Sequence, residues 1–206
     1  MKRKPRAALR LPLACAVICI FSTLASAQKF DVAAGGGTIE APGASNGNGI
    51  DHQPVTLSGG AYVGASGDVR VFHHIALGGE VFWRATQAQN YNLQGFNYRP
   101  FFWNGNVTYS PKIANHTYLE LVGGLGELTT HYYVGSYCGT YQSIGCFHSF
   151  NHFDGDFGAG IRYYPRGRGW FIRPEARVYL INNNFDFSAN YATRIGGSIG
   201  YTFGGH

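Results

Sequence analysis

The chain has 206 residues, of which 45% are hydrophobic, 16% aromatic and only 13% charged, and it contains 30 glycines. Coiled coils need far more Ala, Glu, Lys and Leu, and disordered chains lack so many aromatic residues, so both classes are excluded. The formal net charge of +5 suggests nucleic-acid binding, but the position of the bases excludes this function as well.

The first residues have the anatomy of a secretory signal peptide of the Sec type. Five bases and no acid precede Gln28, and an apolar stretch followed by the sequence Ala-Ser-Ala ends at Ala27. We predict cleavage between Ala27 and Gln28; the alternative is an uncleaved anchor, for which the apolar stretch is short. The chain then divides into a signal peptide (1–27) and a mature domain (28–206). Cleavage removes five of the 16 bases and leaves 11 bases against 11 acids, so no basic surface for nucleic acid remains.

The mature domain is predicted to consist of β-strands, because apolar and polar residues alternate along it. In the clearest segment most apolar residues occupy odd positions, from Val55 and Leu57 to Val71. Aromatic residues, glycines and few charges suit such short strands and tight turns. The eight predicted strands cover residues 29–37, 55–72, 75–84, 101–109, 119–127, 153–163, 172–180 and 191–203.

Two predicted strands depart from simple alternation. Phe102 shares the parity of the polar residues in 101–109, and Glu127 shares the parity of the leucines in 119–127. The position of Glu127 indicates either a β-bulge or the end of a membrane-embedded band.

The connections between the strands alternate in length. An even number of strands joined in this way is typical of a bacterial outer-membrane barrel. We therefore predict an all-β fold, an eight-stranded antiparallel up-and-down transmembrane β-barrel, with both termini on the periplasmic side. The short breaks are expected at 73–74, 110–116 and 165–169, and the longer ones at 40–54, 85–95, 134–151 and 182–190.

Charged residues on the polar strand faces decide which face points inward. In a soluble sandwich or lipocalin-like barrel these charges would face water. Here the bases are nearly all arginines, whose guanidinium groups suit confined pairing with carboxylates, and mature lysines occur only at Lys29 and Lys112. We predict a lumen-facing charge network. Its members are Asp31, Asp68, Arg70, Glu80, Arg84, Glu120, Asp154, Asp156, Arg162, Arg173, Glu175, Arg177 and Arg194.

Aromatic residues on the apolar faces lie near the strand ends. Trp83 is placed towards the longer loops, whereas Trp170, Tyr201 and Phe203 lie near the short turns. Aromatic side chains gather at both bilayer interfaces because they have one apolar and one polar side. We predict that these four residues belong to aromatic girdles.

Two cysteines remain in the mature domain. Cys138 and Cys146 would lie in an oxidising compartment, so we expect a disulfide between them. The alternative is a metal site formed with His131, His148 and His152, although the spacing is not that of a zinc site. We expect neither a metal nor a cofactor.

Three segments resemble the OmpA/OprF-type outer-membrane β-barrel domain, and in particular its small stand-alone members. They are HFDGDFGAGIRYY (152–164), FIRPEARVYL (171–180) and IGYTFG (199–204). The resemblance implies a bacterial outer-membrane protein in contact with outer-membrane lipid. It also implies recognition of the C-terminal strand by the barrel-assembly machinery, although the chain continues past Phe203. Anchoring to the cell wall, which two-domain members of the family provide, is not expected.

Three functional hypotheses follow. The first is a structural or interaction role in the cell envelope, with a lumen filled by side chains and loops that bind a ligand the sequence does not identify. The second is a small channel of low conductance, comparable to a porin. The third is a lipid A-modifying enzyme that uses His148, Ser149 and His152, with Glu127 or Asp154 orienting a histidine. These residues do not reproduce the His-x-Ser spacing of the lipid A deacylases, so we expect no enzymatic activity.

Overall fold

The computed structural model describes residues 29–42, 56–89, 97–133, 147–167, 169–182, 187 and 189–204. Two short strands, β4 (Ala88–Gln89) and β6 (Lys112–Ala114), pair with the long strands beside them. Among the described residues, no helix is long and apolar enough to cross a bilayer. The long strands are β1 (Phe30–Glu40), β2 (Ala61–Phe72), β3 (Ile75–Arg84), β5 (Asn97–Tyr109), β7 (Thr117–Tyr133), β8 (Phe147–Tyr163), β9 (Trp170–Ile181) and β10 (Tyr191–Phe203).

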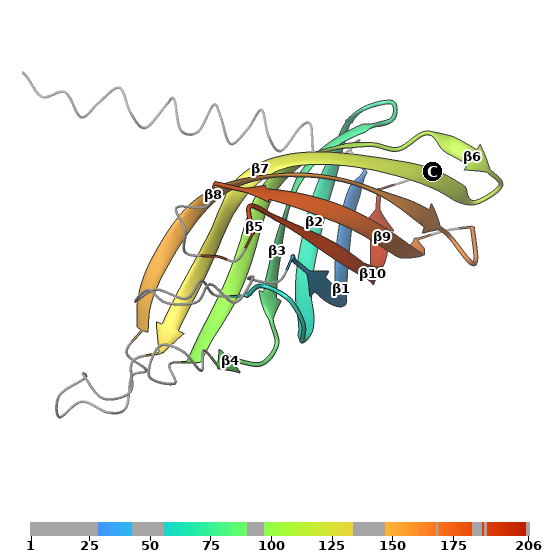
Figure 1. Ribbon diagram of the computed structural model, residues 1–206. Coiled ribbons are helices and arrows are strands. Elements are labelled where there is room, and N and C mark those ends of the chain that lie inside the picture. Colours follow the sequence, from blue (N-terminus) through green and yellow to red (C-terminus); the bar gives the residue numbers. More distant parts are fainter. Residues whose placement is uncertain are drawn as a thin grey trace, which may run out of the picture.

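The eight long strands close into a barrel (Figure 1). Each pairs antiparallel with its neighbours along the chain, and the first strand pairs with the last, from Phe30 opposite Phe203 to Glu40 opposite Thr193. Closure removes the open edges that a flat sheet would expose to other chains. The predicted fold, a closed eight-stranded antiparallel barrel, is confirmed.

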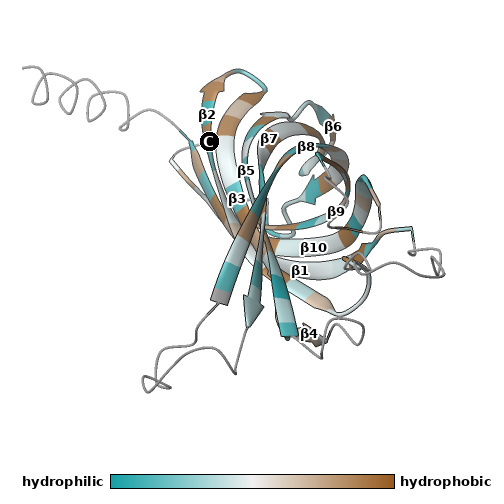
Figure 2. Ribbon diagram, turned by 60° about the vertical axis from the view of Figure 1, so that its left-hand side comes forward, coloured by the Kyte–Doolittle hydropathy of each residue, from teal (hydrophilic) through white to brown (hydrophobic). Residues whose placement is uncertain are grey.

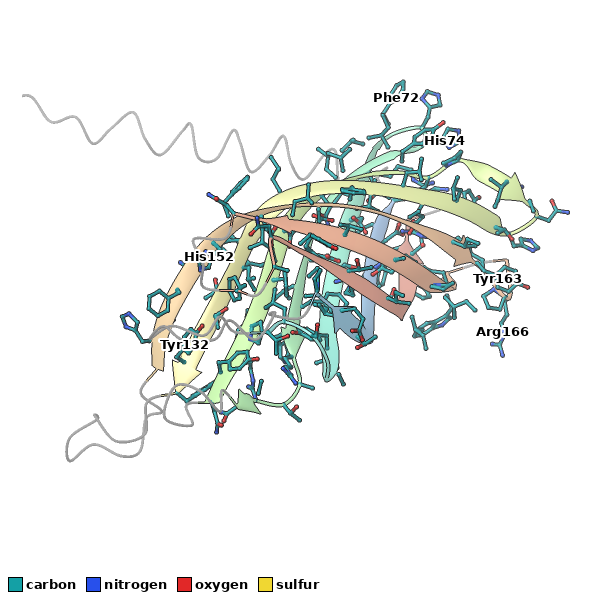
Figure 3. The ribbon with its side chains drawn as sticks, viewed as in Figure 1. Phe72, His74, Tyr132, His152, Tyr163 and Arg166 are labelled. Atoms are coloured by element: carbon teal, nitrogen blue, oxygen red, sulfur yellow. The ribbon has the colours of Figure 1, made fainter. Side chains whose placement is uncertain are left out.

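The two ends of the barrel differ. Three short connections, around residues 73–74, 110–116 and 164–169, lie at one end, which we call the turn end. The opposite strand ends, such as Arg84 of β3 and Tyr133 of β7, lie at the other end of the barrel, which we call the loop end. In Figure 3, Phe72, His74, Tyr163 and Arg166 lie at the turn end, and Tyr132 and His152 lie towards the loop end. The longest strands, β7 and β8 (17 residues each), extend furthest at the loop end (Figure 1, yellow and orange).

Exposure alternates along the strands, and the apolar residues face outward. Leu125 is 64% exposed and Ile199 is 61% exposed, whereas the neighbouring inward side chains are buried. Several strand ends at the loop end are hydrophilic (Figure 2, teal). This alternation fixes the register, because a slip of one residue would bring the outer apolar residues into the lumen.

The predicted strand 55–72 begins too early. Gly59 and Gly60 both have φ of 79°, so the chain turns sharply there and the strand begins at Ala61. Leu57, which the alternation placed on the outer face, is buried inside the loop end with 1% exposure. That part of the prediction is wrong, because strict alternation cannot continue through the turn.

The suggested bulge at Glu127 is also wrong. The pairing of β7 with β8 runs without a register shift from Thr117 opposite Tyr163 to Tyr133 opposite Phe147. Glu127 therefore faces outward, between Trp103 and Phe153 on the adjacent strands. The hairpin of β7 and β8 also extends into the connection predicted at 134–151. Backbone hydrogen bonds between these two strands continue there through polar residues that show no hydrophobic alternation.

The narrow lumen requires glycine at some inward positions. A Cβ atom on Gly124 would collide with the side-chain oxygens of Asn106 and Asp156, and one on Gly200 would collide with the ring of Phe171. An eight-stranded barrel has an interior only wide enough for side chains to fill. These glycines therefore leave room for the larger side chains beside them.

Candidate functional site

The lumen contains a layer of buried charges near the middle of the barrel. Four arginines, from β8, β9 and β10, lie among carboxylates contributed by six of the eight long strands. The inward parity of each strand puts these side chains in one confined space. The buried charged residues are Asp31, Asp68, Glu80, Glu120, Asp154, Asp156, Arg162, Arg173, Glu175, Arg177 and Arg194.

The half of the network nearer the loop end is centred on Glu80. Arg177 Nη1 donates a hydrogen bond to Glu80 Oε1 (2.8 Å), and Arg194 Nη2 donates one to Glu80 Oε2 (3.2 Å). Arg194 Nη2 also contacts Glu175 Oε1 at 2.6 Å, and Arg177 Nη1 contacts Asp156 Oδ2 at 3.2 Å. Two arginines therefore join three carboxylates from three different strands. Such a network resists separation of the strands, because each pair is buried and hydrogen-bonded.

The half nearer the turn end is built on Arg162 and Arg173. Arg162 forms ion pairs with Asp31 and, at 2.6 Å, with Glu120 Oε1. Arg173 Nη1 lies 3.7 Å from Glu120 Oε2 and 3.9 Å from Asp68 Oδ2. Asp31 comes from the first strand, and Arg162 comes from the sixth long strand. The pair therefore connects opposite parts of the chain across the lumen.

Polar and aromatic side chains complete the contacts of the arginines. Arg173 donates hydrogen bonds to Ser66 Oγ (2.9 Å) and Ser198 Oγ (3.1 Å). The guanidinium carbon of Arg194 lies 3.7 Å from the centre of the Phe82 ring, a cation–π arrangement. Alternation alone could not identify these partners, because parity gives the face of a residue but not its height in the barrel.

The buried carboxyl groups outnumber the buried guanidinium groups, by seven to four in the described residues. Neutral donors satisfy part of the difference: Asn104 donates to Asp154, and Ser110 Oγ lies 3.3 Å from Glu120 Oε1. The sequence predicted a nearly balanced network that included Arg70 and Arg84. Both are only partly buried, Arg70 towards the turn end of β2 and Arg84 at the loop end of β3. No ion pair involves either of them within the described part of the chain.

Apolar layers lie inside both ends of the barrel. At the turn end Tyr164 and Phe171 pack with Ala33 and Tyr118. The larger layer, at the loop end, includes Phe102, the aromatic residue that shares the parity of the polar residues in the sequence. Its buried members are Ile39, Leu57, Tyr62, Phe82, Ala88, Tyr98, Phe102, Leu128, Tyr179, Ile181, Phe187 and Ala192.

Two tyrosines hold the connection before β2 against the loop-end layer. Tyr62 donates a hydrogen bond to the carbonyl of Leu57 (2.9 Å), and Tyr98 donates one to the carbonyl of Thr56 (2.6 Å). Leu57 is thereby drawn into the lumen instead of facing outward. The apolar layers at both ends separate the central charges from water, which strengthens their mutual attraction.

The four predicted girdle residues lie on the outer face. Trp170 is 58% exposed, and its ring centre lies 5.4 Å from that of Tyr201, which in turn packs against Phe203 at the turn end. Trp83 stacks on Phe101 near the loop end, with ring centres 6.5 Å apart. The outer face thus carries aromatic residues near both ends of the barrel.

The residues suggested for lipid A chemistry are divided between the faces of the hairpin. Along β8, His148 and His152 have the inward parity of Asp154, whereas Ser149 has the opposite parity. His152 Nδ1 lies 3.2 Å from the carbonyl oxygen of Asn182. Glu127 faces outward, away from Asp154. The alternation therefore separates the serine from both histidines.

The remaining predicted sites lie outside the described residues. These are the cleavage site at Ala27 and Gln28 and the cysteines Cys138 and Cys146. In the described residues, no three His, Cys, Asp or Glu side chains gather as a metal site. The disulfide and the signal peptide remain predictions.

No protein-family model matches the chain, and no curated protein matches its sequence. Among solved structures it is similar to Neisserial surface protein A, with a TM-score of 0.59 and 9% identity over 85% of this chain and 97% of that one. It is also similar to the N-terminal β-barrel domain of Pseudomonas aeruginosa OprF (TM-score 0.55, 11% identity, 85% and 97% covered). A major outer membrane protein from Thermus thermophilus gives a TM-score of 0.57 with 11% identity, over 86% and 100%. The fold is thus that of the small eight-stranded outer-membrane barrels.

Proposed function

We propose that this protein is an integral barrel of the bacterial outer membrane with a structural or interaction role in the cell envelope. The observation that carries the proposal is the combination of an apolar outer face and a filled, charged interior. A soluble barrel of this size would have the opposite polarity. Outward side chains such as Leu125, Phe153 and Ile199 are each more than half exposed, and lipid is the solvent that suits them.

The filled interior favours the hypothesis of a structural scaffold over that of a channel. Apolar layers lie inside both ends, and the charges between them are held in ion pairs from several strands. An ion passing through the lumen would have to separate buried pairs, at a cost of several kcal/mol. We propose that the rigid barrel presents the loop-end connections to the exterior, where they are free to bind a partner.

We also propose that the barrel-assembly machinery recognises the C-terminal strand. Tyr201 and Phe203 lie on the outer face of β10, and this strand closes the barrel against β1. We propose that residues 199–203 form the recognised signal and that residues 1–27 direct export. Loss of folded barrel from membranes after a Phe203→Ala substitution, with Phe150→Ala as a control at the loop end, would support this proposal.

Fractionation and conductance measurements test the proposed function together. Outer-membrane fractions should contain a band that migrates faster in unheated than in heated samples, which indicates a folded barrel. In planar bilayers the refolded protein should be silent or open rarely with small conductance. Steady, large conductance would contradict the scaffold and favour the channel, and recovery only in the soluble fraction would contradict both.

A further inference from the structure

The mouth of the barrel at the turn end contains a small basic cavity. Its volume is about 60 Å³, enough for several water molecules or one small oxyanion. Its lining includes Lys29, Arg70, Lys112, His116, Tyr164 and Thr202, and no residue that lines it is acidic. The lumen network, in contrast, supplies carboxylates to each of its arginines.

The backbone holds the bases of this cavity beside one another. The amide of Arg70 donates to the carbonyl of Lys29 (2.9 Å), so the end of β2 lies beside the residue that precedes β1. On the opposite side, Lys112 pairs with Tyr118, and the amide of Tyr164 donates to the carbonyl of His116 (2.9 Å). With Thr202 of β10, five separate segments of the chain therefore converge on the cavity.

Two turns with positive φ angles approach each other closely in the wall of the cavity. His116 has φ of 61° and Gly167 has φ of 69°, and a Cβ atom on Gly167 would lie 2.9 Å from His116 Nε2. Tyr164 Oη and Thr202 Oγ1 are 2.9 Å apart and add hydroxyl groups to the lining. The cavity therefore has a wall with a fixed backbone and hydroxyl groups, which distinguishes it from lysines scattered over an exposed surface.

The three bases at this mouth form no ion pair with any other described residue. None of the ion pairs between described residues involves Lys29, Arg70 or Lys112. Arg166, in the neighbouring turn, lies at the same end (Figure 3). Bases that converge on a cavity without a carboxylate attract an anion, and oxyanions match the hydrogen-bonding geometry of Arg and Lys.

We propose that the turn-end cavity binds a phosphate group. Arg70 and Lys112 hold its charge from opposite sides, and Lys29 and the hydroxyl groups contribute further hydrogen bonds. The phosphate is either inorganic phosphate entering from the aqueous side or the headgroup phosphate of a phospholipid reaching over the rim. The cavity opens at the mouth of the barrel, on the inward side of Tyr164, so the soluble source has the direct route.

The test measures phosphate binding by the full chain refolded in maltoside micelles, which contain no phosphate. One titration uses inorganic phosphate and a second uses a short-chain phosphatidylglycerol, with the corresponding diacylglycerol as the control that lacks phosphate. The variants are Arg70→Gln and Lys112→Gln. Arg99→Gln, at the loop end, removes the same charge away from the cavity and is the matched control.

We expect binding of at least one phosphate probe, weakened about tenfold or more by Arg70→Gln and by Lys112→Gln and unchanged by Arg99→Gln. The probe that binds identifies the source of the phosphate. Absence of binding by the unsubstituted chain would overturn the proposal, as would equal loss in Arg99→Gln or equal binding of the diacylglycerol. Heat-dependent gel migration of each variant verifies that the barrel is folded, so a folding defect is not mistaken for loss of the site.

Discussion

Arg173 and Glu175 join the two halves of the lumen network. Arg173 Nε lies 3.4 Å from Glu175 Oε2, and the same oxygen lies 3.5 Å from Arg177 Nη2. The other oxygen of Glu175 contacts Arg194 at 2.6 Å. One carboxylate therefore contacts three of the four buried arginines, so its removal weakens the pairing of all three at once.

Replacement of Glu175 should destabilise the barrel strongly. We expect Glu175→Ala to lower the free energy of unfolding by about 3–5 kcal/mol, because it removes one ion-pair partner from each of three buried guanidinium groups. The measurement is urea unfolding in lipid vesicles, monitored by tryptophan fluorescence. Glu127→Ala makes the same chemical change on the outer face and should have a much smaller effect. Equal losses in both variants would contradict a network held by buried pairs.

The contact between Arg194 and Glu80 should be cooperative. Glu80→Gln and Arg194→Gln each break the pair, but the double variant leaves no unpaired charge at that contact. We expect a coupling energy of about 1–3 kcal/mol in a double-mutant cycle of unfolding free energies, the range typical of residues in one buried network. Additive single effects would indicate that the two groups do not interact in the membrane.

The loop-end apolar layer should contribute to stability independently of the charges. Phe102 is fully buried, and its ring centre lies 4.7 Å from that of Tyr179. We expect Phe102→Ala to lower the unfolding free energy by about 3–5 kcal/mol, because it creates a cavity. Phe157→Ala removes an identical ring from the outer face, where lipid fills the space, and should cost clearly less. A larger loss for Phe157 would mean that the two faces have been exchanged.

The sequence predicts the faces of the strands better than their ends. Alternation is reliable from Tyr191 to Phe203, where the predicted and observed bounds of β10 agree. It fails at the loop end, where β8 begins at Phe147 and not at 153. Hydrophobic alternation arises only where one face of a strand is turned towards lipid. Nearer the loop end, backbone hydrogen bonds hold neighbouring strands together whatever their side chains are.

The pairing inside the lumen is predictable only in part. Parity indicates that Arg162 and Asp31 face inward, but not that they meet, since 131 residues separate them along the chain. Their contact depends on strand tilt and register, which the sequence pattern does not specify. The loop-end layer escaped prediction for a similar reason, because aromatic residues such as Tyr62 and Tyr98 share the parity of the polar residues and only their height makes them a separate layer.

Inward glycines should be required where the lumen is crowded. Gly124→Val would push a side chain against Asn106 and Asp156, so we expect little folded barrel in assembly assays that use heat-dependent gel migration. Gly123→Val is the matched control, because its nearest neighbour would be a backbone oxygen 3.9 Å away and the outer face has room. Valine also favours strands, so Gly123→Val should fold as well as the unsubstituted chain. Normal folding of Gly124→Val would show that the interior is less filled than the structure indicates.

The most direct test of the barrel's inside-out polarity uses its own tryptophans. The chain has 3 tryptophans, Trp83, Trp103 and Trp170, and all of them have outward parity. In vesicles made with phospholipids brominated along their acyl chains, tryptophan fluorescence should be strongly quenched, and soluble acrylamide should quench it weakly. Fluorescence that is insensitive to brominated lipid but quenched by acrylamide would mean that the apolar face does not contact the bilayer.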